Sequence, residues 1–120
     1  MVREGQNASG YRLSIPRVPP SLNRMRHWTA KHREMKTWML EIKAAGGKQQ
    51  AKGEMRVTIT LYNARQYDRD NAWGACKPIL DAMKGLGLIV DDRAQYCELQ
   101  VLQERSTRKD KRTVIEVEPA

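Results

Sequence analysis

The sequence predicts an α/β (α+β-like) fold: one small domain with a mixed sheet of about four to five strands and two main helices. The chain has 120 residues, which is enough for one domain with a core but too few for two. Strand-type and helix-type apolar periodicities alternate along it in the order β-α-β-α-β-β, with no internal repeat or linker. Residues 1–10 are polar and are expected to form a flexible leader, leaving 11–120 as the domain.

The first half of the domain predicts a strand, a helix and a second strand. Apolar and polar side chains alternate over residues 11–15, and prolines and a turn over 16–23 end that strand. A helix is expected from residue 30 to about 45, with Thr29 as its N-cap and Gly46-Gly47 as its end. Its apolar residues follow helical spacing: Met35, Trp38, Met39 and Ile42.

The second half predicts one more helix and two more strands. Residues 55–61 alternate as a strand, and the next helix runs from about 70 to 84, before a glycine-rich break. A short apolar segment at 88–90 leads into an acidic pair. Strands are expected at 96–104 and 113–118, joined as a hairpin by the basic segment 105–112.

The charge balance favours a polyanionic partner. Lys and Arg number 22 against 14 Asp and Glu, a net charge of +8 with a pI near 9.8. Residues 1–52 carry the whole excess, with eleven basic and three acidic residues. A basic surface attracts nucleic acid because binding releases the counterions of the phosphates. A merely soluble basic protein remains about as good an explanation of the charge alone.

Cysteine usage and hydropathy predict a cytoplasmic protein. Cys76 and Cys97 fit neither a disulfide framework nor a zinc site, so both are expected to be buried free thiols. The sequence has no apolar run of membrane-spanning length and no signal-peptide pattern near Met1. No membrane partner is expected.

An acidic cluster precedes and follows the second helix. Asp68-Arg69-Asp70-Asn71 stands at its start, and Asp91-Asp92 follows the short apolar segment. One interpretation is capping, in which Asp70 or Asn71 binds free backbone N–H groups at the helix start. The other is a site for a hard cation such as Mg²⁺, which prefers carboxylate oxygens. Spacing alone favours turn-forming and capping aspartates.

Helix geometry limits which acids could share one ion. At 100° per residue, Lys77 and Asp81 lie on the same face as Asp70, and Gly74 leaves open space between them. Eleven residues span roughly 16 Å, so Asp81 cannot bind the same metal as Asp70. Pro78 either kinks this helix or begins a new one. The opposite face is expected to enter the core: Trp73, Cys76, Ile79, Leu80 and Met83.

These motifs together resemble the RusA family of Holliday-junction resolvases. The D-R-D-N segment at 68–71, the K-P-I-L-D-A segment at 77–82 and the acidic pair 91–92 occur in the family's order. The P-P-S-L-N segment at 19–23 is similar to the family's element after the first strand. The resemblance extends over about residues 11–104.

The resemblance implies a homodimeric endonuclease that binds four-way DNA junctions and needs Mg²⁺ or Mn²⁺. It would act in DNA recombination and repair. By motif position, Asp68, Asp70 and Asp92 would be the catalytic metal ligands, Asp91 a less certain contributor and Lys77 the basic catalytic residue, whose charge would stabilise the transition state. Asp81 would support the structure. One departure is that Lys77 stands seven residues after Asp70, a helical turn farther than in the pattern most familiar for the family.

DNA binding is expected from basic side chains in the first half of the chain and beside the acidic cluster: Arg24, Arg26, Lys31, Arg33, Lys36 and Arg69. A second candidate set is Arg108, Lys109, Lys111 and Arg112. Trp28 is expected in the core rather than on DNA. The alternatives are a non-catalytic RusA-like DNA-binding or regulatory protein, which the position of Lys77 favours, and a metal nuclease acting on other branched DNA. A basic protein-interaction module is an outside alternative.

Overall fold

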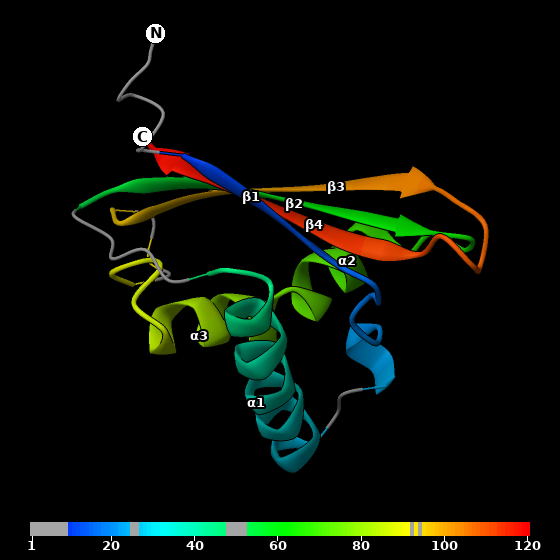
Figure 1. Ribbon diagram of the computed structural model, residues 1–120. Coiled ribbons are helices and arrows are strands. Elements are labelled where there is room, and N and C mark those ends of the chain that lie inside the picture. The colour runs from blue at the N-terminus through cyan, green and yellow to red at the C-terminus, as the bar shows by residue number, and fades with distance from the viewer. Residues whose placement is uncertain (1–9, 25–26, 48–52, 92, 94) are drawn as a thin grey trace, which may run out of the picture.

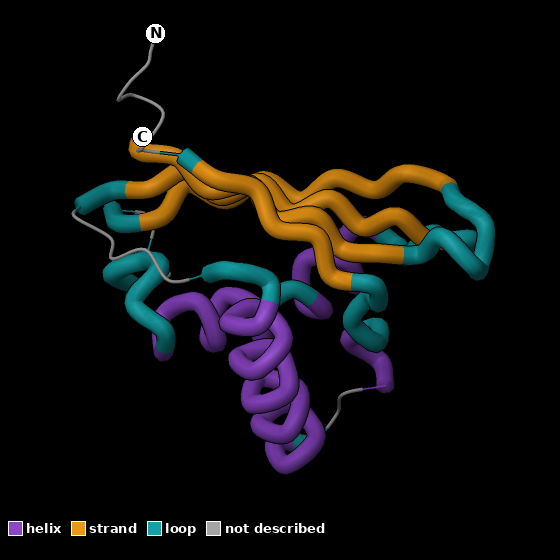
Figure 2. Tube along the Cα trace, in the orientation of Figure 1, coloured by secondary structure: helices purple, strands orange, loops and turns teal. Residues whose placement is uncertain are grey.

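One mixed sheet, covered by helices on a single face, organises the chain (Figure 1). The computed structural model describes residues 10–24, 27–47, 53–91, 93 and 95–120. The elements in chain order are β1 (Tyr11–Ile15), the short 3₁₀ helix η2 (Leu22–Arg24), α1 (Trp28–Ala44), β2 (Met55–Asn63), α2 (Arg69–Ala75), α3 (Lys77–Gly85), β3 (Cys97–Arg105) and β4 (Arg112–Pro119). Figure 2 shows all the helical segments on the same side of the strands.

The sheet has four strands in the order β1-β4-β2-β3. β2 pairs with β3 in parallel, with Met55 opposite Cys97 and Asn63 opposite Arg105. β4 runs antiparallel to both of its neighbours, β1 and β2. The mixed α/β class predicted from the sequence is confirmed, with the second helix divided in two.

The expected hairpin between the last two strands is wrong. β2 lies between β3 and β4, so the connection over residues 106–111 crosses the carboxyl end of β2 instead of joining neighbours. The Ser106 N–H donates to the carbonyl of Asn63 at 3.1 Å, which holds the crossing against that strand end. A basic loop of this length fits either connection, and so the sequence pattern did not separate them.

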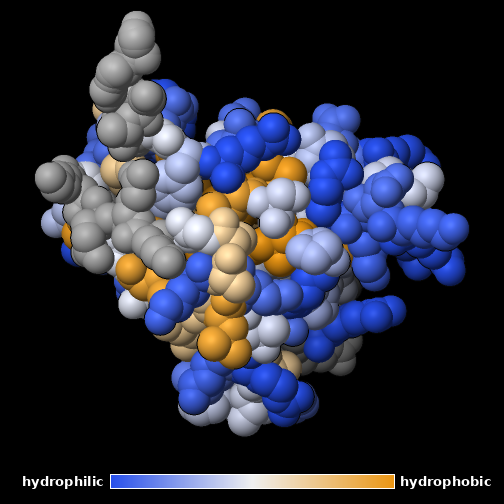
Figure 3. All heavy atoms as spheres, in the orientation of Figure 1, coloured by the Kyte–Doolittle hydropathy of each residue, from blue (hydrophilic) through white to orange (hydrophobic). Residues whose placement is uncertain are grey.

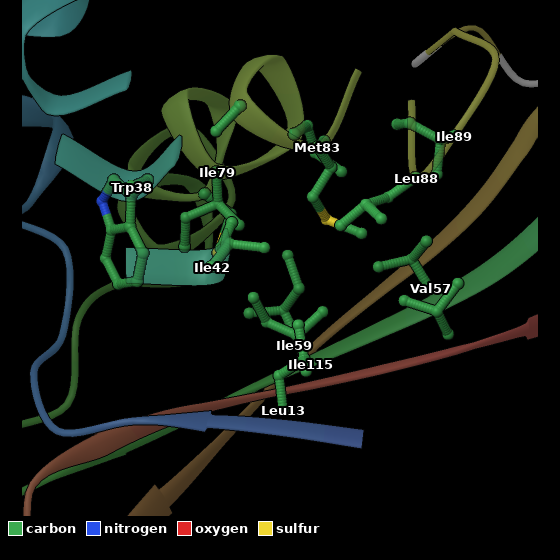
Figure 4. Close-up of a cluster of buried hydrophobic side chains, with 14 of the residues drawn as sticks. Leu13, Trp38, Ile42, Val57, Ile59, Ile79, Met83, Leu88, Ile89 and Ile115 are labelled. Atoms are coloured by element: carbon green, nitrogen blue, oxygen red, sulfur yellow. The ribbon is translucent and has the colours of Figure 1, made fainter. Parts of the chain in front are cut away.

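The core lies between the sheet and the helices (Figure 4). Val57, Ile59 and Ile115 point from the strands toward side chains of α1 and α3. Period-two alternation on β2 and helical spacing on α3 place these apolar groups on facing surfaces. Trp38 and Ile42 of α1 are fully buried there, as their spacing predicts.

Arg17 fastens α1 to the segment that follows β1. Its Nε donates to Glu41 at 2.6 Å, its Nη1 donates to Glu34 at 3.0 Å, and its guanidinium lies 4.0 Å from the ring centre of Trp38. Trp38 Nε1 also donates to Glu34, at 3.1 Å. Both acidic side chains of α1 therefore serve this contact.

The start of α1 differs from the sequence expectation, whereas its end agrees with it. The helix begins at Trp28 after His27, so Thr29 lies inside its first turn and the predicted N-cap is wrong. At the other end the Gly47 N–H donates to the carbonyl of Ile42 at 2.9 Å, and Gly46 has a φ of 106°. Glycine adopts that left-handed conformation without a Cβ clash, which explains the predicted stop at this pair.

The second predicted helix breaks at Cys76. Pro78 lies in the first turn of α3, where its missing N–H costs no helical hydrogen bond. Of the residues expected to face the core, Cys76, Ile79, Leu80 and Met83 are buried. Trp73 is 43% exposed, so its predicted burial is wrong, because the break ends the continuous helical face on which the prediction relied.

Candidate functional site

A polar cleft of about 520 Å³ opens at the carboxyl end of β2. The loop from β2 to α2 forms one wall and the segment after β1 forms the other. Its lining residues are Pro20, Ser21, Arg24, Asn63, Arg65, Gln66, Tyr67, Asp68 and Asn71. Two motifs that lie almost 50 residues apart in the sequence, 19–23 and 68–71, thus border one cavity.

Tyr67 holds the acidic segment in place. Its backbone N–H donates to Gln103 Oε1 at 2.8 Å, and its carbonyl accepts from Gln103 Nε2 at 2.9 Å. Its hydroxyl donates to the carbonyl of Pro19 at 2.8 Å, and burial raises the pKa of that hydroxyl. Asp68 therefore follows a residue that is fixed to both β3 and the proline segment.

α2 packs closely on η2, which brings the acidic segment 68–71 and the proline segment 19–23 together. A Cβ added to Gly74 would lie 2.7 Å from Leu22 Cδ2. The space expected beside Gly74 is therefore filled by Leu22, and the glycine permits this approach.

Capping does not account for the Asp68 carboxylate. Asp68 occupies the N-cap position of α2, but its side chain makes no capping hydrogen bond. Asp70 lies exposed in the first turn, where a carboxylate complements the helix dipole. The two carboxylates and Asn71 supply oxygen ligands of the kind that Mg²⁺ prefers, and exposure leaves room for its waters.

Cationic side chains gather around this end of the sheet. Arg24 and Arg65 line the cleft itself, and Arg69 is exposed at the start of α2. The crossing loop adds further exposed charges, and the hydrophilic right-hand end in Figure 3 is where this loop lies. The guanidinium of Arg112 lies 3.9 Å from the ring centre of Tyr62. The loop and its flanks contribute Arg105, Arg108, Lys109, Lys111 and Arg112.

Asp91 lies at the other end of the sheet. It pairs with Arg93 at 2.8 Å and with Lys84 at 3.6 Å, just before β3 begins. The cleft is level with Gln103, six residues beyond Cys97 at the start of β3, which corresponds to roughly 20 Å at the usual rise of a strand. Asp92 lies outside the described residues. Among the residues that are described, no three His, Cys, Asp or Glu side chains form a group able to hold a metal ion.

Lys77 and Asp81 border two further cavities. Lys77 Nζ pairs with Asp81 at 3.4 Å, as the i,i+4 spacing allows. Lys77 lies in a groove with Trp73, Leu80 and β3 residues 97–99. Asp81 lies in a cavity at the start of α1. The described geometry therefore places Lys77 in a cavity other than the one that Asp68 lines.

The predicted DNA-binding residues of α1 are exposed: Lys31, Arg33 and Lys36. Arg26 lies outside the described residues. Trp28 is 70% exposed, so its predicted place in the core is wrong. It stands in the first turn of α1, beyond the part of the helix that reaches the sheet.

Sequence reasoning missed Arg65, Tyr67 and Gln103 as parts of the site. Arg65 and Tyr67 flank the acidic segment and could have been chosen by position alone. Gln103 gave no signal, because its role depends on the parallel pairing of β3 with β2.

Both cysteines are buried free thiols, as predicted. Burial raises the pKa of Cys76 to about 12 and also raises that of Cys97. Neither thiol has the lowered pKa that a reactive cysteine requires. In the described part of the chain, no helix has the length and apolar character needed to cross a membrane.

Comparison with known proteins adds no evidence on function to the geometry described above. No protein-family model matches the chain, and a search of curated proteins finds no match either.

Proposed function

We propose that this chain is a RusA-like, structure-specific endonuclease that resolves Holliday junctions by metal-dependent, paired nicking of opposed DNA strands. The observation that carries the proposal is the cleft that Asp68 lines together with Arg24, Arg65 and the proline segment, to which Tyr67 is hydrogen-bonded at Pro19. Carboxylates beside cations suit phosphodiester hydrolysis, because the cations bind phosphates while the acids bind a metal. The resemblance of the motifs to the RusA family adds the four-way junction as substrate.

The charged residues in and beside the cleft have proposed roles. Asp68 and Asp70 would hold Mg²⁺ or Mn²⁺, whose charge would supply polarisation of the scissile phosphate and activation of the attacking water. Arg24 and Arg65 bind the phosphates that flank the cut and keep the strand against the carboxylates. Arg69 and the crossing loop bind the backbone farther along the duplex arm.

The third carboxylate is proposed to come from a second copy of the chain. Asp91 precedes the start of β3, and the cleft is level with Gln103, roughly 20 Å farther along that strand, so one protomer does not gather Asp91 with Asp68. Among the described strands, β3 pairs on one side only. If two β3 strands pair antiparallel across a two-fold axis, the start of one lies beside the end of the other. Asp91 of one protomer then approaches Asp68 and Asp70 of its partner, and Asp92, the next residue in the sequence, is proposed as the third metal ligand.

The same β3-to-β3 dimer would also bring a second copy of the chain close to Lys77. Its groove lies against residues 97–99 of β3, next to the free edge. A second copy on that edge would meet Lys77, whose charge is proposed to stabilise the phosphorane-like transition state. Dimerisation would also cover Trp73, which is exposed in this groove.

The second candidate function is junction binding without cleavage. The separation of Asp91 and Lys77 from the cleft within one protomer favours it, since binding needs only the cationic end of the molecule. For either function we propose the cytoplasm as compartment, because both cysteines are free and buried.

A cleavage assay separates the two candidates. The full chain is incubated with a synthetic four-way junction or a linear duplex, with and without Mg²⁺ or Mn²⁺. Symmetric nicking of the junction alone supports the resolvase. Tight junction binding with no cutting under either metal leaves the non-catalytic function, and equal binding of junction and duplex contradicts both.

Asp70→Asn tests the site within that assay. We expect it to abolish cutting while junction binding is kept or strengthened, because the change removes a metal ligand and a charge that repels phosphate. Glu116→Gln, which also neutralises an exposed carboxylate but lies on β4 outside the cleft, is the control and should cut normally. Normal cutting by Asp70→Asn would contradict the site assignment.

A further inference from the structure

A second cavity, of about 450 Å³, opens at the start of α1. Its lining residues are Trp28, Lys31, His32, Met35 and Asp81. The rings of Trp28 and His32 have centroids 5.4 Å apart and planes inclined by 34°. An aromatic pair beside a lysine thus borders an open cavity that the proposed catalytic cleft does not include.

The fold itself does not use the Trp28 ring. Trp38, on the same helix, is fully buried against the sheet, whereas Trp28 is 70% exposed. A tryptophan offers a large apolar face, and leaving it in water forgoes the stabilisation that burial gives. Exposed aromatic rings with polar surroundings are typical of binding surfaces.

The charged side chains of α1 that remain available near the cavity are all cationic. Both acidic side chains of the helix, Glu34 and Glu41, pair with Arg17. The remaining charged residues of α1 are cationic and exposed: Lys31, Arg33, Lys36 and Lys43. Asp81 on the facing helix pairs with Lys77 and can still accept a hydrogen bond at the cavity rim. An aromatic platform flanked by cations matches a base attached to its phosphates.

The cavity also lies close to the proposed cleft. Arg24 lines that cleft, and Trp28 follows it four positions later along the chain. Even a fully extended chain spans at most about 14 Å over that length. A DNA strand that leaves the cleft can therefore reach the Trp28 ring.

We infer that Trp28 and His32 form a stacking platform for an unpaired DNA base, with Lys31 binding the adjacent phosphate. The inference rests on the proposed function, since a branch point supplies unpaired or easily unpaired bases. Stacking accepts any base, because every base presents a π-face. The platform thus gives preference for distorted over fully paired DNA without sequence readout.

Binding measurements in EDTA test the platform separately from catalysis. Fluorescence anisotropy of the full chain is measured with a labelled 20-nucleotide single strand and with a 20-base-pair duplex at one salt concentration. Trp28→Ala is expected to weaken single-strand binding by about 5- to 100-fold, with duplex binding nearly unchanged. Trp28→Phe should retain most of the affinity. Leu40→Ala is the matched control, since Leu40 is 72% exposed on the same helix but outside the cavity.

Three results would overturn the platform. They are unchanged single-strand binding by Trp28→Ala, an equal loss on single strand and duplex, and an altered oligomeric state with DNA affinity unchanged. The last would assign the ring to a protein contact. Because Trp28 is largely exposed, the variants should keep the wild-type circular dichroism spectrum. Junction cleavage by the unaltered chain in Mg²⁺ tests the proposed function independently.

Discussion

Gln103 is the side chain through which β3 positions the acidic segment. Gln103→Leu removes both hydrogen bonds to the Tyr67 backbone while keeping a similar volume. We expect the free energy of unfolding to fall by about 1–3 kcal/mol, because a partly buried N–H and carbonyl lose their partner. Junction cutting should fall more than junction binding, since Asp68 is no longer held beside the cleft. Urea denaturation and the cleavage assay measure the two effects.

Gln100→Leu is the control for that substitution. Gln100 is exposed three residues earlier on the same strand, so its replacement should change stability by less than about 0.5 kcal/mol. Equal effects of the two substitutions would show that Gln103 acts only through strand propensity.

The sequence predicted the burial of some single residues correctly and of others wrongly. Cys76 and Cys97 were identified as buried thiols because apolar neighbours surround them in the sequence. Trp28 was placed in the core because large aromatic rings usually pack there, and Trp73 because it falls on the apolar face of one continuous helix. Trp38 was predicted correctly, because it shares helical spacing with Ile42 on the face of α1 that meets the sheet.

Gly74 governs the contact between α2 and η2. Gly74→Ala places a Cβ 2.7 Å from Leu22 Cδ2, and overpacking of this kind costs about 1–3 kcal/mol. Better helix propensity offsets about 0.5–1 kcal/mol of that cost. We therefore expect a small loss of stability, with a larger loss of junction binding because η2 carries Arg24 into the cleft.

The double substitution Gly74→Ala with Leu22→Ala should restore binding. The smaller side chain at position 22 makes room for the new methyl group, so a double-mutant cycle gives a favourable coupling. Denaturation and anisotropy on the four proteins measure it. Additive effects would mean that Leu22 does not transmit the change at Gly74.

Elements were predicted where one periodicity runs unbroken, as in β2 and α1. The pattern failed where connectivity decides the outcome. Apolar spacing continues across Cys76, so it predicted one helix, and only Pro78 signalled the new start that the structure contains. The parallel placement of β3 was not predicted either, since alternation fixes which face of a strand is buried but not its neighbour.

The whole molecule has two unlike ends. Arg24, Arg65 and the crossing loop make the carboxyl end of β2 cationic, and this end carries the cleft. The other end carries Asp91 and the start of β3. The D-R-D-N segment and the proline segment belong to the same family resemblance, and they border one cavity. Asp91 was predicted at the same metal site as the D-R-D-N segment, and the length of β3 separates it from that segment within one protomer.

Mixing two inactive variants tests whether two protomers build each site. Asp70→Asn and Asp92→Asn are each expected to abolish cutting by homodimers. In a heterodimer of the two, a shared arrangement gives one site with both substitutions and one site with neither. Differently tagged chains, co-expressed and purified through both tags, should therefore nick a junction on one strand only. Sites contained within single protomers would leave that heterodimer inactive, and elution as a monomer would exclude the shared site altogether.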